Sequence, residues 1–173
     1  MYTKAFIPYK GYYSTPFCRW QGSMANENAI VLGANTAKRW FAEKGFDVTM
    51  LDYMYFGITI GQPGLFYSHV WAAGMLSDDK KNLPALMINQ ACTTSATCLH
   101  LSAANLETGL YQTVYNMMVD RCSNGPHTVW PNPMGPGGEV VSENWMMDHF
   151  NKDPWAGGAM IQTAENVAKE IGA

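Results

Sequence analysis

The chain has 173 residues, of which 47% are hydrophobic and 14% are charged, and its formal net charge is -3. This length is typical of one domain with a sizeable apolar core. The sequence has no basic run, which disfavours nucleic-acid binding, and no apolar run approaches the ~20 residues of a membrane span. Because charged residues are scarce and 13% of residues are aromatic, we expect a partner or a further part of the protein to cover much of the surface.

The cysteines and the N-terminus bear on the cellular compartment. Cys18, Cys92, Cys98 and Cys122 show neither CxxC pairing nor a metal-type spacing with histidine. We therefore expect free thiols and no metal site, as in a reducing compartment. No long apolar core with a small-residue cleavage site follows the N-terminus, so no secretory signal is predicted and the cytoplasm is the expected location.

The first 119 residues alternate strand-like and helix-like patterns. Apolar residues at three- and four-residue steps indicate helices, and short aromatic or β-branched runs bounded by glycine or proline indicate strands. In chain order we expect a strand over 4–8, a helix capped by Ser23 or Asn26 and running to about Lys44, a strand over 52–57, a helix over 66–76, a strand over 85–89, a helix over 93–107 and a strand over 113–119.

This alternation predicts a parallel sheet flanked by helices. Ligand sites in such sheets lie at the carboxyl ends of the strands, and Cys92 stands there, between the run 85–89 and the helix over 93–107. The positive end of the helix dipole would face its sulfur and favour thiolate over thiol. Cys92 is therefore a candidate nucleophile, although most free cysteines are small buried hydrophobes. The other cysteines are expected to be packed: Cys18, Cys98 and Cys122.

The composition changes after Val119. Residues 120–139 contain four prolines and four glycines, which predict a long irregular excursion. A loop of that length inside a compact domain is usually functional or packs on something else. A final helix is expected over 158–171, with apolar residues along one side. The chain is thus expected to divide into residues 1–119 and 120–173.

Three blocks of sequence carry a resemblance to a known family. They are residues 14–24 (STPFCRWQGSM), residues 88–92 (INQAC) followed by 99–104 (LHLSAA), and residues 160–168 (MIQTAENVA). In order and spacing they resemble the opening block, the nucleophile block and the loop-domain helix of the thiolases, the acyl-CoA C-acyltransferases. Two departures stand out. Ser14 occupies a position where the family usually has arginine, and Thr93-Thr94-Ser95-Ala96 replaces the family's Gly-Ser-Gly, which narrows the space beside the thiolate.

The resemblance implies an α/β, thiolase-like fold: the N-terminal βαβαβαβ part with a mostly parallel sheet, plus part of the loop domain. Residues 1–119 would be the core that bears the nucleophile, and residues 120–173 the beginning of an incomplete, substrate-covering loop domain. Full thiolases are considerably longer. The family's activating histidine, second reactive cysteine and oxyanion donors belong to a C-terminal half, so the resemblance implies a complementary part or second subunit, in a homo- or hetero-oligomer.

The activity implied is acyl transfer through an acyl-Cys92 intermediate. A 3-oxoacyl-CoA would be cleaved by coenzyme A, or formed in the reverse Claisen condensation, with acyl-CoA as substrate and no covalently bound cofactor. Met160 matches a family position near the acyl and pantetheine end of the substrate, although a methionine that fills the core explains it equally. His127 follows a Gly-Pro turn where it would line a substrate pocket, although such a histidine is more often a polar loop residue.

Two other functions fit the sequence. A thiolase-like assembly or regulatory subunit without catalysis would explain why no base accompanies Cys92. A decarboxylating condensing enzyme related to the ketoacyl synthases would also use a cysteine nucleophile. The block at 160–168 favours a thiolase over such a synthase.

Overall fold

The structure is a computed structural model that describes residues 2–64, 66–76 and 83–173. The chain forms two compact units, Met1–Asn124 and Gly125–Ala173. The change of composition lies close to this boundary, at residue 119. No described helix has the length and apolar character needed to cross a membrane.

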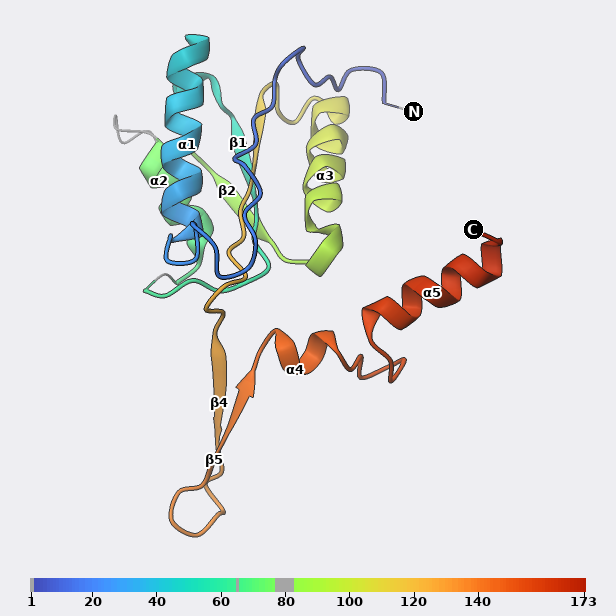
Figure 1. Cartoon of the computed structure of the whole chain (residues 1–173). Helices are drawn as coiled ribbons and strands as arrows, with labels where there is room; N and C mark the ends of the chain where they lie inside the picture. Colours follow the sequence, from blue (N-terminus) through green and yellow to red (C-terminus); the bar gives the residue numbers. More distant parts are fainter. Residues whose placement is uncertain (1, 65, 77–82) are drawn as a thin grey trace. The chain divides into compact units, whose positions relative to one another are not determined.

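The first unit is built on a three-stranded sheet. Its strands are β1 (Tyr53–Gly57), β2 (Ala85–Ile88) and β3 (Val114–Met118), in the order β2-β1-β3. Both neighbours run parallel to β1, with Met54 opposite Ala85 on one side and Tyr115 on the other. Figure 1 shows the three strands side by side, so their carboxyl ends share one edge. The predicted α/β fold with a parallel sheet is confirmed.

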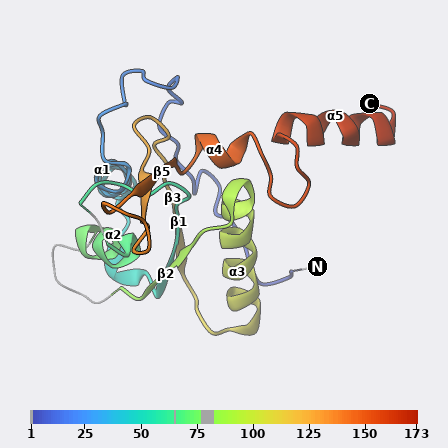
Figure 2. The same cartoon turned by 90° about the horizontal axis from the view of Figure 1, so that it is seen from below.

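Helices cover both faces of this sheet. Helices α1 (Ala29–Lys44) and α2 (Ser68–Leu76) pack together on one face, and α3 (Thr94–Thr108) packs on the other (Figure 2). The predicted N-caps of the first helix, Ser23 and Asn26, are wrong. The cap is Asn28. Its side-chain oxygen accepts hydrogen bonds from the backbone N–H groups of Ile30 and Val31, in the first turn of the helix.

The core lies between the sheet and helices α1 and α2. The largest fully buried side chains of the unit are Phe56, Ile30, Met54 and Cys98. Three of them, with Phe41 and Leu76, belong to one apolar cluster that joins β1 to both helices. Burial of large apolar side chains is the main favourable term in folding, so this cluster holds the central strand in place.

The strand predicted over 4–8 does not form, and the βαβαβαβ order therefore lacks its first strand. Phe6 and Ile7 are 76% and 70% exposed, and Pro8 has no N–H to donate to a ladder. The preceding backbone is held by a side chain instead, because the N–H groups of Thr3 and Lys4 both donate to the Glu107 carboxylate on α3, at 2.8 and 2.7 Å.

This anchor predicts a pH dependence. Hydrogen bonds from the backbone N–H of Lys4 and from the hydroxyl and backbone N–H of Thr3 lower the pKa of Glu107 from 4.5 to about 2. A carboxyl group with a lowered pKa in the folded chain stabilises it above pH 4.5, and that contribution is lost as the pH falls towards 2. We expect NMR titration of the Thr3 and Lys4 amides to follow a group with a midpoint near 2.

The variant Glu107→Gln provides the control for that titration. The amide side chain does not ionise, so the acid transition of the Thr3 and Lys4 resonances should disappear. A midpoint near the ordinary 4.5 in the unmodified chain would contradict the anchor.

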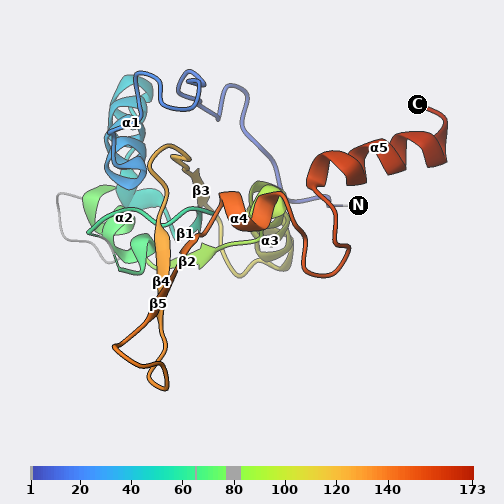
Figure 3. The ribbon, with the colours of Figure 1, turned by 60° about the horizontal axis from the view of Figure 1, so that its bottom comes forward.

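The second unit contains a β-hairpin and two helices. Strands β4 (His127–Pro131) and β5 (Val140–Asn144) pair antiparallel, and α4 (Met147–Phe150) and α5 (Met160–Ile171) follow (Figure 3). The irregular excursion predicted over 120–139 is therefore partly wrong. Trp130 lies opposite Val141 in a regular ladder, and Pro131 is tolerated because it ends an edge strand.

Candidate active site

Cys92 lies on the turn between β2 and α3. The turn is a single 3-10 turn, Ala91–Thr93, and Cys92 is exposed at the carboxyl edge of the sheet. The first helical residues of α3 follow at once, and Thr93, at the N-cap, makes no side-chain capping bond. The N-terminal N–H groups of a helix have no partner within the helix and carry a partial positive charge. Cys92 is therefore the exposed residue just before the N-cap of α3, and its position between β2 and the helix can be followed in Figure 1.

The backbone of this turn is strained. Ala91 has a φ of 47°, in the left-handed region that residues other than glycine adopt rarely. Thr93 and Thr94 have negative φ values of -93° and -51°. Thr93 stands where the family has its first glycine, and its negative φ shows that it fits this path without strain. The unfavourable conformation falls instead on Ala91, the residue just before the thiol.

Hydrogen bonds hold the turn in this shape. The hydroxyl of Thr94 accepts from the backbone N–H of Gln90 at 2.8 Å and donates to the carbonyl of Ala91 at 2.7 Å. The backbone N–H of Thr94 also donates to the Ala91 carbonyl. The hydroxyl of Thr93 donates to the carbonyl of Gln90 at 2.8 Å. The residues on either side of Cys92 are thus tied to each other.

The loops that follow the three strands are linked along the same edge. The carboxylate of Asp120, after β3, accepts from the backbone N–H groups of Thr59 and Ile60, after β1, at 2.9 and 3.0 Å. The side-chain amide of Asn89, after β2, donates to the carbonyl of Thr59 at 3.4 Å. These hydrogen bonds hold the loops after β1, β2 and β3 in fixed positions relative to one another.

The other cysteines differ from Cys92 in their surroundings. Cys98 is fully buried inside α3, as predicted, and burial raises the pKa of its thiol. Cys18 and Cys122 were predicted to be packed, but both are exposed because they lie on loops. Partial burial, with a smaller contribution from Asp120, raises the pKa of Cys122 and keeps it in the thiol form.

His127 and Met160, the two candidate substrate contacts, both belong to the second unit. Met160 is the first residue of α5, and 46% of its surface is exposed. His127 begins β4, with Nδ1 3.2 Å from the hydroxyl of Ser142 and Nε2 3.4 Å from the amide nitrogen of Asn144. An amide nitrogen only donates, so Nε2 is the acceptor in the contact with Asn144. Both ring nitrogens therefore have partners within the hairpin.

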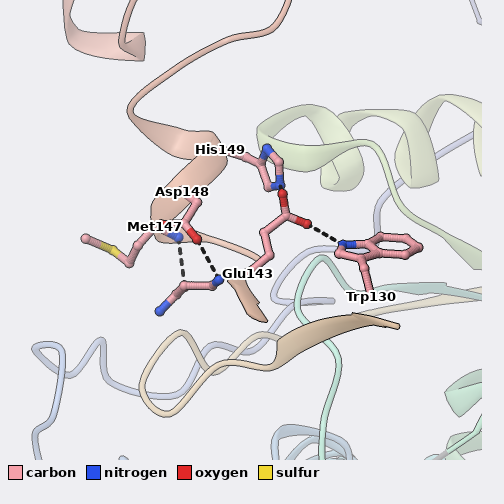
Figure 4. Close-up of polar contacts among 6 residues, drawn as sticks. Trp130, Glu143, Met147, Asp148 and His149 are labelled. Carbon is pink, nitrogen blue, oxygen red and sulfur yellow. Dashed lines mark hydrogen bonds and ion pairs between the residues drawn. The ribbon is translucent and has the colours of Figure 1, made fainter. Parts of the chain in front are cut away.

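A polar cluster joins this hairpin to α4 (Figure 4). The Glu143 carboxylate accepts from the indole N–H of Trp130 at 2.9 Å and contacts Nε2 of His149 at 2.8 Å. The backbone N–H of Met147 donates to the side-chain oxygen of Asn144 at 2.9 Å, which fixes the orientation of that amide. A two-stranded hairpin alone is only marginally stable, and these contacts add links between it and the helix that follows.

Sequence reasoning missed the residues that shape the turn around Cys92. Thr94 is 5% exposed, and its methyl group lies against Gly57 of β1. A Cβ at Gly57 would be 2.9 Å from that methyl carbon and 3.3 Å from the sulfur of Cys98, so only glycine fits. Nothing in the sequence pairs positions 57 and 94, because the contact depends on how α3 packs on the sheet. In the described residues, no group of three His, Cys, Asp or Glu side chains is arranged to hold a metal ion.

Comparison with solved structures identifies the fold. An acetyl-CoA acetyltransferase from Bacillus anthracis matches with a TM-score of 0.71 and 17% identity, covering 88% of this chain and 38% of that one. One from Syntrophomonas wolfei matches with a TM-score of 0.70 and 20% identity, covering 91% and 40%. This chain has the fold of part of a thiolase. It spans about 40% of the length of these thiolases. No protein-family model and no curated protein sequence matches it.

Proposed function

We propose that the chain is the N-terminal part of a thiolase-type acyl-CoA acyltransferase and that Cys92 is its nucleophile. The observation that carries this proposal is the exposed thiol at the N-terminal end of α3, on the strand-turn-helix of a thiolase fold. An exposed thiol at a helix N-terminus is in the environment that makes cysteines nucleophilic.

In the proposed reaction the sulfur of Cys92 attacks the ketone carbon of a 3-oxoacyl-CoA. The carbon–carbon bond between that carbon and its α-carbon breaks, leaving an acyl-cysteine and the enolate of acetyl-CoA, which takes up a proton. The thiol of a second coenzyme A then attacks the acyl-cysteine and restores Cys92. The backbone N–H of Cys92 would donate to the developing oxyanion.

The remaining groups are proposed to come from a complementary part of the protein. The chain covers about 40% of the thiolases that it matches, and no described histidine forms a hydrogen bond with Cys92. We propose that a C-terminal part or a second subunit, in a homo- or hetero-oligomer, supplies the base that deprotonates Cys92 and the acid that protonates the enolate.

The second unit is proposed to be the beginning of a loop domain that covers the substrate. In this proposal Met160 contacts the acyl and pantetheine end of the substrate, and His127 lines the substrate pocket. The four free cysteines agree with a cytoplasmic location.

Substrate protection provides the test. The protein is incubated with iodoacetamide in the presence and absence of acetyl-CoA, and the alkylated cysteines are identified by peptide mapping. We expect Cys92 to react faster than the buried Cys98 and acetyl-CoA to slow Cys92 at least severalfold. The exposed Cys18 is the matched control and should react equally in both conditions. The proposal fails if acetyl-CoA protects no cysteine, or protects Cys18 and Cys92 alike.

A second candidate function is a non-catalytic assembly subunit with a thiolase fold. The lack of a described histidine bonded to Cys92 favours it. This alternative predicts that Cys92 is alkylated without protection by acetyl-CoA. A condensing enzyme of the ketoacyl-synthase type would instead accept a malonyl thioester in a decarboxylating condensation, and would show no thiolysis with free coenzyme A.

A further inference from the structure

We infer that Thr94 is the positioning residue of the nucleophile: its hydroxyl holds Ala91 in the left-handed conformation that presents Cys92 at the N-terminal end of α3. The inference deepens the proposed function, since it concerns the same thiol. Thr94 does not touch substrate, because it is 5% exposed and lies beneath the turn.

The backbone at Ala91 is strained. A residue with a Cβ at a φ of 47° has an unfavourable backbone energy, and such strain persists only where the surroundings hold it. Three hydrogen bonds hold Ala91. Its backbone N–H donates to the side-chain oxygen of Asn89 at 3.5 Å, and its carbonyl accepts from the backbone N–H of Thr94 and, at 2.7 Å, from the Thr94 hydroxyl. Of the two bonds from Thr94, only the hydroxyl bond depends on its side chain.

The same hydroxyl also holds the residue before Ala91. It accepts from the backbone N–H of Gln90 at 2.8 Å. One buried oxygen therefore uses both its donor and its acceptor capacity across the turn, on either side of the strained peptide. Without this hydroxyl, the Gln90 N–H loses its acceptor and the Ala91 carbonyl loses one of its donors. Ala91 is then free to relax to a negative φ, which changes the direction of the Cys92 side chain.

Packing against the sheet fixes the position of the Thr94 hydroxyl. The methyl group of Thr94 lies against the bare Cα of Gly57, where an added Cβ would come within 2.9 Å of it. Cys98, one helical turn after Thr94, fills the other side of that contact and is fully buried. Contact with the central strand thus determines the rotamer of Thr94, and the Thr94 hydroxyl determines the conformation of Ala91. The packing of α3 on the sheet therefore influences the position of the Cys92 thiol.

The variants Thr94→Val and Thr94→Ser separate the hydroxyl from the methyl group. Valine keeps the shape and removes the hydroxyl, whereas serine keeps the hydroxyl. The readout is the ratio of the alkylation rates of Cys92 and Cys18 in the same molecule, with iodoacetamide as the probe. Loss of two buried hydrogen bonds should lower this ratio at least about fivefold in Thr94→Val, and Thr94→Ser should stay within about twofold of the unmodified chain.

A rescue experiment distinguishes positioning from a general structural role. Glycine adopts positive φ without strain, so adding Ala91→Gly to Thr94→Val should restore much of the ratio. A purely structural role of Thr94 predicts no such rescue. An unchanged ratio in Thr94→Val, an equal loss in Thr94→Ser, or a double variant no better than Thr94→Val would each overturn the inference.

If Thr94→Val does not fold, hydrogen exchange of the unmodified chain decides the question. The Gln90 amide should be protected because it donates to the buried hydroxyl, and exchange at the rate of an open loop would overturn the inference. The alkylation assay uses no acyl-CoA. A drop in the ratio with rescue therefore supports the positioning role even if acetyl-CoA fails to protect Cys92, which would count against the proposed function alone.

Discussion

Replacing Cys92 with alanine is expected to lower acyl transfer from a 3-oxoacyl-CoA to coenzyme A at least about a thousandfold, because no acyl-enzyme forms without the sulfur. The measurement is thiolysis followed by loss of substrate, in the assembly that contains the complementary part. Mass spectrometry of the quenched protein should show an acyl group on Cys92 in the unmodified chain and none in Cys92→Ala.

Cys18→Ala is the matched control, since it removes another exposed thiol of the same unit. It should keep its activity within about twofold, as expected for a substitution of an exposed residue. An active Cys92→Ala variant would contradict the proposal that Cys92 is the nucleophile. An acyl group found on Cys18 or Cys122 would assign the role to that cysteine instead. Cys98 is excluded from that role by its complete burial and raised pKa.

Replacing Phe56 with alanine is expected to destabilise the first unit by about 3–5 kcal/mol, because it opens a cavity at a fully buried aromatic of the central strand. That loss is a large share of the ~5–15 kcal/mol typical of a whole domain. Urea denaturation followed by circular dichroism should show a much lower midpoint, or a chain that is already unfolded in buffer.

Phe17→Ala tests the same chemical change at a position that is 98% exposed. It should alter the free energy of unfolding by less than about 0.5 kcal/mol. If the two phenylalanine variants were equally stable, β1 would not be the centre of the core. A large effect of Phe17→Ala would mean that a partner or a second copy covers that side chain in solution.

The helices and the parallel strands could be predicted because their signals are local. The spacing of Ile30, Ala37 and Phe41 fixes one buried face of α1, and the structure buries all three. The run before Cys92 and the helical pattern after it place a turn between them in any α/β fold. Such patterns depend on residues that are neighbours in the chain, and tertiary packing preserved them.

The predictions from the sequence were wrong where contacts between residues far apart in the chain determine the local structure. The segment 4–8 has a strand-like composition, but the Glu107 carboxylate binds the backbone just before it and no described strand pairs with it. The hairpin β4–β5 depends on a ladder between residues such as Trp130 and Val141, which the density of proline and glycine obscures. The predicted cap of α1 was also wrong: Asn28, and not Ser23 or Asn26, accepts hydrogen bonds from the first N–H groups of the helix.

The sequence by itself determined the thiolase-like order of blocks and the place of Cys92 between a strand and a helix. Both depend only on the order and spacing of residues along the chain. Only the tertiary structure decided the conformation of that place. The strained φ of Ala91 and the buried hydroxyl of Thr94 require the helix to lie on the sheet with Gly57 directly beneath. Packing between segments far apart in the chain sets that geometry, and local patterns do not encode it.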